Sequence, residues 1–303
     1  MIIGASLGSF RGLDLNQAME LYLKLAGDFG LGAVEIRFEK EKGRPSLWPW
    51  EVNQRVSKFT SQFPVSGAHL PFAYLNPISM NSGIRTESLN QLKLGIRKAS
   101  ELSMHYVVMH ARGAAYDMTQ EQQLAEWARL IAELVVYAEE HSVILTVENA
   151  DSLANLRQLA TLIREIGSKS LKITFDVGHA YTRIIPHLSL YPVRELLLKA
   201  LDTTLPCPLT MPFGIKSGMP FDEYGSIPNF INAEHDLIFG WHLHDYNGRN
   251  GHMTIGDGKI DFSFLPALED AGFLGPLILE PEFNIHYSDF KTNYERLQKL
   301  IKR

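Results

Sequence analysis

Short apolar runs alternate along this chain with longer segments of helical period, and this alternation restricts the fold more than any other feature. The runs are rich in β-branched and aromatic residues, as strands are, and they occur at residues 2–10, 33–39, 65–72, 105–113, 143–150, 171–180, 237–246 and 276–283. Repeated βα units form a parallel sheet, and eight parallel strands close a barrel. The sequence therefore predicts an α/β fold, a single (β/α)₈ TIM barrel.

The segments between the runs have apolar residues at every third or fourth position, most clearly at 120–142 and 152–167. We expect these segments to be outer helices, with Thr119 as an N-cap. No Pro/Gly/Ser-rich linker or low-complexity tract divides the chain. Residues 1–303 are therefore predicted to form one domain.

A long stretch at about residues 183–236 interrupts this rhythm between the sixth and seventh runs. It is rich in proline and longer than one connecting helix requires. Because it follows a strand, we expect this insertion on the C-terminal face, where barrel enzymes keep their sites. It is either a solvated excursion or a lid.

Charge and cysteine content argue against several classes of protein. Lys plus Arg is 29 and Asp plus Glu is 34, a net charge of −5, which gives no electrostatic reason for non-specific nucleic-acid binding. The one cysteine, Cys207, precludes an intramolecular disulfide and suits a reducing compartment. No apolar run approaches the roughly 18 residues of a membrane span, and the first residues do not resemble a secretory signal. These features predict a cytoplasmic protein without a membrane partner.

From the third run onward, each apolar run ends in, or is closely followed by, side chains that can bind a metal. These residues are His69, His110, Glu148, Asp176, His179, His242, His244, His252 and Glu280. The C-terminal ends of barrel strands surround one axis, so these groups can meet although they are far apart in sequence. Burying them without a cation would be costly. We therefore expect one or two divalent ions; the ligand types suit Zn²⁺, Mn²⁺, Fe²⁺ or Co²⁺, and we favour Zn²⁺ or Mn²⁺.

The order and spacing of several motifs resemble the xylose-isomerase-like superfamily over nearly the whole chain. The most specific pieces are FDVGHAY at 175–181, WHLHDYNG at 241–248, GHMTIGDGKIDF at 251–262 and LILEPE at 277–282. This superfamily includes sugar-phosphate isomerases and epimerases, and also DNA-repair enzymes of the endonuclease IV type. The likeness is specific for the superfamily and says little about the substrate.

In the epimerase members, one metal is held by a glutamate, an aspartate, a histidine and a second glutamate. The resemblance places these ligands at Glu148, Asp176, His242 and Glu280. It also implies that the two glutamates flank the substrate and transfer a proton beside a carbonyl, while the metal polarises the oxygens. The substrate-binding residues that it implies are His179, Arg249, His69 and His110.

The endonuclease-like members bind three metals, and the chain is similar to them in part. His69 and His110 match histidines of the first metal, with Glu148 as a bridge. The second metal is matched by Asp176, His242 and Glu280, and the third by His179 and His252. The three-metal pattern has an aspartate where this chain has Asn250, and an amide is a poor substitute for an anionic ligand. A centre with one or two metals is therefore expected.

Four other polar residues each have two interpretations. Glu35 and Arg37 alternate with apolar neighbours, so they either face the barrel mouth or form a buried ion pair. His244 either lines the pocket or supports a ligand, and Asp245 either orients a ligand histidine or caps the following loop.

The predicted function is that of an enzyme, a divalent-metal-dependent isomerase or epimerase of a sugar or sugar phosphate. Two alternatives stay open. One is an endonuclease IV-like zinc phosphodiesterase acting on abasic-site DNA, against which the net charge of −5 counts. The other is a barrel that binds a sugar without turnover. A homo-oligomer is compatible with each of these functions, although the sequence identifies no interface.

Overall fold

The computed structural model describes the chain except for residues 39–47, 114, 116, 185–223, 284–286 and 303. Eight parallel strands close a barrel in sequence order. They are β1 (Ile2–Ser6), β2 (Ala33–Arg37), β3 (Val65–His69), β4 (Tyr106–Met109), β5 (Ile144–Glu148), β6 (Leu171–Asp176), β7 (Ile238–Leu243) and β8 (Pro276–Leu279). The predicted TIM barrel is confirmed, and every strand lies within one of the eight apolar runs.

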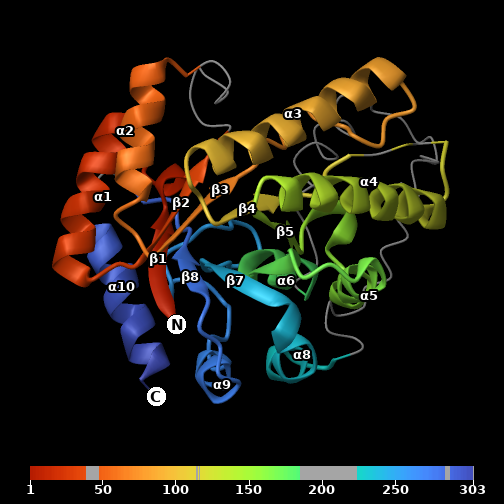
Figure 1. The fold of residues 1–303 in the computed structure, drawn as a ribbon. Helices are drawn as coiled ribbons and strands as arrows, with labels where there is room; N and C mark the ends of the chain where they lie inside the picture. The colour runs from red at the N-terminus through yellow and green to blue at the C-terminus, as the bar shows by residue number, and fades with distance from the viewer. Residues whose placement is uncertain (39–47, 114, 116, 185–223, 284–286, 303) are drawn as a thin grey trace, which may run out of the picture.

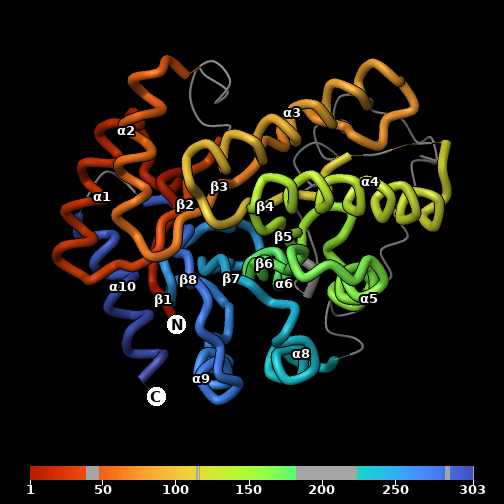
Figure 2. The backbone as a smooth tube through the Cα atoms, viewed as in Figure 1, coloured from red at the N-terminus to blue at the C-terminus, as the bar shows by residue number. Residues whose placement is uncertain are grey.

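Helices surround the barrel (Figure 1). They are α1 (Leu15–Phe29), α2 (Trp50–Thr60), α3 (Ser82–Glu101), α4 (Gln120–Glu140), α5 (Leu156–Ile166), α6 (Val177–Ile184), α8 (Ile227–Glu234), α9 (Leu265–Asp270) and α10 (Tyr287–Ile301), with 3-10 turns η1 (Leu7–Ser9), η3 (Asp151–Leu153) and η4 (His235–Leu237). In the tube view, α1, α2 and α10 lie on one side of the barrel, and α4 and α5 lie on the other (Figure 2). Strand β1 pairs with β8, so the first and last strands of the chain are neighbours.

Local signals in the sequence account for where several helices begin and end. Thr119 is the N-cap of α4 and shares a reciprocal capping box with Gln122, as the sequence predicted. Gly30 and Gly167 end α1 and α5 in the left-handed conformation, with φ of 68° and 71°, which costs glycine least.

Two segments differ from the sequence-based expectation. The sixth strand ends at Asp176, because the Asp176 carboxylate accepts the backbone N–H of His179 at 2.6 Å and so caps the first turn of α6. His179 consequently lies on a helix rather than at a strand end. Of the predicted insertion at about 183–236, residues 185–223 lie outside the described part, and its C-terminal portion forms α8 and η4.

Several strands place polar side chains toward the barrel axis, between apolar side chains that pack against the helices. On β2, Val34 and Ile36 belong to the hydrophobic core, whereas Glu35 between them contacts Tyr106 on β4 and His242 on β7. Neither of those strands neighbours β2, so the contacts cross the interior of the barrel. The interior therefore holds a polar layer inside a hydrophobic shell.

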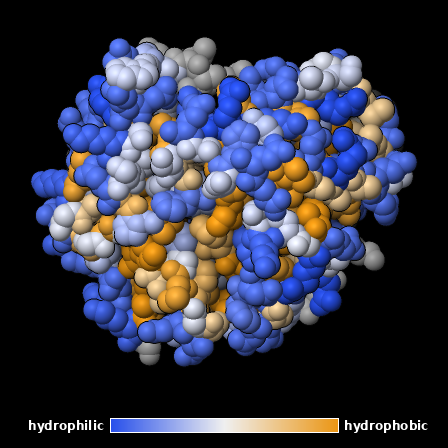
Figure 3. Space-filling view, in the orientation of Figure 1, coloured by the Kyte–Doolittle hydropathy of each residue, from blue (hydrophilic) through white to orange (hydrophobic). Residues whose placement is uncertain are grey.

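The outer surface of the molecule is also divided into hydrophilic and hydrophobic regions. On the face drawn in Figure 3, hydrophilic residues cover most of the outer helices, and hydrophobic residues gather toward the middle. No helix in the described part of the chain has the length and apolar content needed to cross a membrane.

Candidate metal centre and active site

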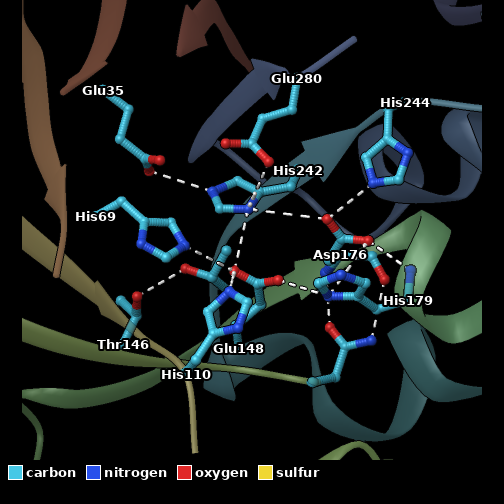
Figure 4. Close-up of polar contacts among 12 residues, drawn as sticks. Glu35, His69, His110, Thr146, Glu148, Asp176, His179, His242, His244 and Glu280 are labelled. Atoms are coloured by element: carbon cyan, nitrogen blue, oxygen red, sulfur yellow. Dashed lines mark hydrogen bonds and ion pairs between the residues drawn. The ribbon is translucent and has the colours of Figure 1, made fainter. Parts of the chain in front are cut away.

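The four residues expected to bind one metal converge at the C-terminal end of the barrel (Figure 4). His242 Nδ1 lies 3.3 Å from Glu148 Oε2, 3.6 Å from Glu280 Oε2 and 3.9 Å from Asp176 Oδ2. All four side chains are buried. Tetrahedral ligands about 2.1 Å from a zinc ion are about 3.4 Å apart, and the three carboxylates lie at comparable distances from His242 Nδ1. Among the described residues, groups whose ligand atoms all lie within 4.8 Å of one another join Glu148 and Asp176 with His179, and His242 and Glu280 with Glu35.

The polar atoms of this cluster fit a divalent cation. His242 Nδ1 and Glu280 Oε1 are buried, and neither makes a hydrogen bond of good geometry with the described residues. Buried polar atoms without partners are costly and rare in native proteins. Carboxylate oxygens and one imidazole nitrogen, without a thiolate, are ligands that Zn²⁺ and Mn²⁺ accept.

A second pair of imidazoles faces the same glutamate from β3 and β4. The Nε2 atoms of His69 and His110 lie 3.5 Å and 3.1 Å from Glu148 Oε2. Their Nδ1 atoms donate to the carbonyl of Leu70 and to the carboxylate of Asp151, at 3.0 Å and 3.1 Å. Both rings are thus oriented with Nε2 toward Glu148, which lies between them and His242.

Of the other residues predicted for the site, His179 adjoins the cluster, whereas His252 and Arg249 lie outside it. His179 Nδ1 lies 2.7 Å from Glu148 Oε1, so this histidine adjoins the cluster. His252 donates from Nδ1 to the Glu280 carbonyl at 2.9 Å, and it lies outside the potential metal-binding groups found among the described residues. Arg249 and Asn250 are exposed on the loop after β7. The structure therefore does not bring Arg249 or Asn250 into the cluster.

The buried carboxylates are held in their ionised form by neighbouring cations. Burial alone would raise the pKa of Glu280, but the charges of His242 and then Arg37 outweigh it, and the pKa falls to about 2. Burial likewise opposes ionisation of Asp176, and His179 and His244 outweigh it, so its pKa lies below the usual range. At neutral pH these carboxylates are therefore ionised, which is the form that binds a cation.

Imidazoles of the cluster carry much of the compensating charge, as the pKa values of His110 and His179 illustrate. Burial would lower the pKa of His110, but Glu148 and Asp151 raise it to about 10. For His179, burial is outweighed chiefly by Asp176 and Glu148, and the pKa rises to about 9. Because a bound cation would compete with these protons, we expect metal uptake to release protons.

His244 contacts the candidate ligand Asp176 on the side away from Glu148 (Figure 4). Its Nδ1 accepts the backbone N–H of His252 at 2.9 Å, so its Nε2 carries the hydrogen and donates to Asp176 Oδ2 at 3.1 Å. A Cβ added to Gly178 would collide with the His244 ring, so glycine is needed there for this approach. The geometry favours the second interpretation of His244, the support of a ligand.

Asp245 fixes the loop that follows β7. Its carboxylate accepts four backbone N–H groups, those of Tyr246, Gly256, Gly258 and Ile260, at 2.7, 2.8, 2.9 and 3.1 Å. The carboxylate is buried. The geometry favours the second interpretation of Asp245, a loop cap, which holds the segment containing His252 against the barrel.

Replacing Asp245 by asparagine is expected to lower the free energy of unfolding by about 2 kcal/mol or more, because hydrogen bonds to a charged group are lost and an amide N–H₂ faces donors. Denaturant unfolding followed by circular dichroism measures the change. Asp257→Asn is the matched control on the same loop: this carboxylate is half exposed and pairs with Arg296, so its loss costs about 1 kcal/mol at most. Equal losses in the two variants would contradict the role given to Asp245.

Three polar residues around the cluster were undecided or overlooked from sequence. Glu35 pairs with His242 and not with Arg37. Asn149 accepts the backbone N–H of Asp176 at 2.6 Å and donates to its carbonyl, and Asp151 orients His110. The signal for Asn149 and Asp151 was their position one and three residues after Glu148. For Glu35 it was a charge alternating with apolar residues in a strand.

Comparison with known proteins identifies the fold family. Residues 23–302 match the family described as xylose isomerase-like TIM barrel. An uncharacterized protein of Methanocaldococcus jannaschii is 26% identical over 221 residues, covering 70% of this chain and 62% of that protein. The match thus spans less than two thirds of the length of this curated relative.

Several solved structures share the fold over the whole chain. A D-tagatose 3-epimerase-like protein is 23% identical with a TM-score of 0.71, covering 100% of this chain and 97% of its own. A Thermus thermophilus protein soaked with zinc chloride is 20% identical with a TM-score of 0.65, covering 100% and 98%. An L-ribulose 3-epimerase is 13% identical with a TM-score of 0.68, covering 100% and 95%. At these identities the likeness establishes the architecture.

Proposed function

The chain belongs to the xylose isomerase-like TIM barrel family, and from this we propose that it is a divalent-metal-dependent isomerase or epimerase of a sugar or sugar phosphate. The observation that carries the proposal is the pair of buried glutamates on β5 and after β8. Glu148 and Glu280 each bring a carboxylate oxygen within 3.3 Å and 3.6 Å of the same nitrogen, His242 Nδ1. A barrel that only binds a sugar has no use for two such carboxylates at one cation site.

The proposed cation ligands are Glu148, Asp176, His242 and Glu280. When bound, a divalent cation supplies the positive charge that polarises the substrate's carbonyl oxygen. One of the two glutamates, in its ionised form, removes the proton from the carbon beside that carbonyl. The other, after taking up a proton from solvent, returns that proton to the same carbon or to its neighbour. Return to the opposite face inverts the carbon, whereas return to the neighbouring carbon moves the carbonyl.

Histidines on three elements would bind the substrate beside these carboxylates. His69, His110 and His179 all contact Glu148, so a sugar placed there can donate or accept hydrogen bonds at their rings. Arg249, on the exposed loop after β7, would contact a hydroxyl or phosphate oxygen at the edge of the site. Two of the similar structures are named for epimerases of the ketoses D-tagatose and L-ribulose, which supports ketoses as the first substrates to test.

The direct test is solvent exchange. We expect the protein loaded with Mn²⁺ or Zn²⁺ in D₂O to replace a C–H proton beside the carbonyl of a ketose or ketose phosphate with deuterium and to form a second sugar. Proton NMR of a panel of such sugars measures both events. Absence of exchange with the whole panel, in protein shown to contain the metal, would contradict the proposal.

One observation favours a second candidate function. His69 and His110 face Glu148 in the way that a second metal would require, and phosphodiesterases use such paired metals. The same metal-loaded preparation can be assayed for incision of duplex DNA with an abasic site at low salt. With a net charge of −5, we expect no incision; efficient incision would replace the isomerase proposal.

A further inference from the structure

We infer that Glu35 is a positioning residue for the metal centre: it holds His242 in the tautomer and orientation that leave Nδ1 free to bind a cation. The inference rests on the proposed function, because it concerns the same centre. None of the roles described above for the cluster uses Glu35, although it is one of the most deeply buried carboxylates of the described chain, with 0% exposure.

The first argument is the hydrogen bond itself. His242 Nε2 lies 3.2 Å from Glu35 Oε2, and a carboxylate oxygen can only accept, so Nε2 carries the hydrogen. In the neutral ring Nδ1 then has the lone pair. That atom is the one surrounded by the oxygens of Glu148, Asp176 and Glu280.

The second argument is how Glu35 is itself held. Tyr106 donates its hydroxyl hydrogen to the same Oε2 atom at 3.1 Å, from β4. A Cβ on Gly67 would collide with the Tyr106 ring, so the glycine of β3 makes room for that ring inside the barrel. Tyr106 therefore holds the Glu35 carboxylate in place independently of His242. A residue that orients a metal ligand needs such a support of its own.

Two other roles for Glu35 fit the geometry less well. The contacts of the described residues include no ion pair between Glu35 and Arg37. The charge of Arg37 instead lowers the pKa of Glu280. Glu35 could in principle be a ligand with His242 and Glu280, whose polar atoms lie within 4.8 Å of one another. That arrangement would use Nε2, which faces one carboxylate, whereas Nδ1 on the other side of the ring faces three (Figure 4).

The test compares Glu35→Leu with Glu35→Gln. Leucine removes the acceptor, so we expect affinity for Mn²⁺, measured by calorimetry on chelator-treated protein, to fall about 10- to 100-fold, the usual cost of losing such a partner. Glutamine retains an oxygen that can accept from both Nε2 and Tyr106, so its affinity is expected to stay within about threefold of the wild type, well inside that cost. Thr146→Val, which removes a buried hydroxyl bonded to the Val107 carbonyl and to Thr174 and has no hydrogen bond or ion pair with Glu35 or His242 among the described contacts, is the matched control and is expected to stay close to the wild type.

A spectroscopic readout tests the tautomer directly. In the Zn²⁺-loaded wild type, ¹H–¹⁵N NMR of the histidine side chains should show a slowly exchanging Nε2–H signal of His242, assigned by its loss in His242→Gln. Glu35→Gln should keep this signal. A wild type without the signal would overturn the inference even if Glu35→Leu failed to fold.

The remaining outcomes separate this inference from the proposed function. Wild-type affinity in a folded Glu35→Leu variant would overturn the role of Glu35 and leave the isomerase proposal standing. An equal loss of affinity in Glu35→Gln and Glu35→Leu would also overturn it, because the charge rather than the acceptor would then matter. If the wild type bound no divalent metal, both proposals would fall.

Discussion

Replacement of Glu280 or Glu148 by glutamine is expected to slow proton exchange between substrate and solvent by about 10²- to 10⁴-fold, the usual contribution of a general acid or base. An amide of the same shape cannot accept the proton from carbon. Both carboxylates lie near His242 Nδ1, at 3.3 Å and 3.6 Å, and the proposal gives each of them a separate step, so each variant should be impaired. Deuterium incorporation into the ketose, followed by NMR, measures the rate.

Two controls make this result specific. Metal content must be measured in each variant, because both glutamates are also proposed ligands; the decisive comparison uses metal-saturated protein. Glu269→Gln, at an exposed position on α9, makes the same chemical change far from the cluster and should exchange at the wild-type rate. Unchanged exchange in both Glu148→Gln and Glu280→Gln would rule out the proposed proton transfer.

Replacement of Asp176 by asparagine is expected to weaken metal binding by more than about 100-fold, since losing even an outer partner of a ligand costs 10- to 100-fold. Asp176 has 0% exposure and brings a negative charge to within 3.9 Å of His242 Nδ1. A ligand at 100 times its Kd adds about 2.7 kcal/mol to stability, so saturating Mn²⁺ should raise the wild-type Tm by roughly 5 °C. The variant should lose that rise.

The measurement is thermal unfolding with and without Mn²⁺, together with metal analysis of protein purified without chelators. We expect about one or two metal equivalents per wild-type chain. Asp270→Asn on the exposed end of α9 should keep the full Mn²⁺-dependent rise. An Asp176→Asn variant that keeps it as well would show that the cation, if bound, is held elsewhere.

The sequence predicted the architecture and the convergence of the candidate ligands because both follow from periodicity. Asp176 and His242 each end an apolar run, and in a closed parallel barrel the ends of such runs meet at one mouth. Once the eight runs are recognised, their order around the axis follows. This is why residues more than one hundred positions apart could be placed in one cluster from the sequence.

The parts that sequence could not predict depend on side-chain direction and on local capping. The alternation of Glu35 with Val34 and Ile36 indicated an inward side chain, but only the structure shows that it contacts His242 across the barrel. The start of α6 depends on one hydrogen bond, from the His179 N–H to Asp176, which no hydrophobic pattern encodes. The sequence likewise could not predict how many backbone N–H groups donate to Asp245, because that number depends on the path of the following loop.

The pairing of β1 with β8 has a consequence for the biogenesis of the protein. While translation is short of residue 276, the nascent sheet has two open edges, at β1 and β7, and such edges invite pairing with other chains. Glu280 emerges only four residues after that point, directly behind the last strand. Completion of the proposed metal-binding pocket and protection from aggregation are therefore expected to occur in the same step, once β8 and Glu280 have been synthesised.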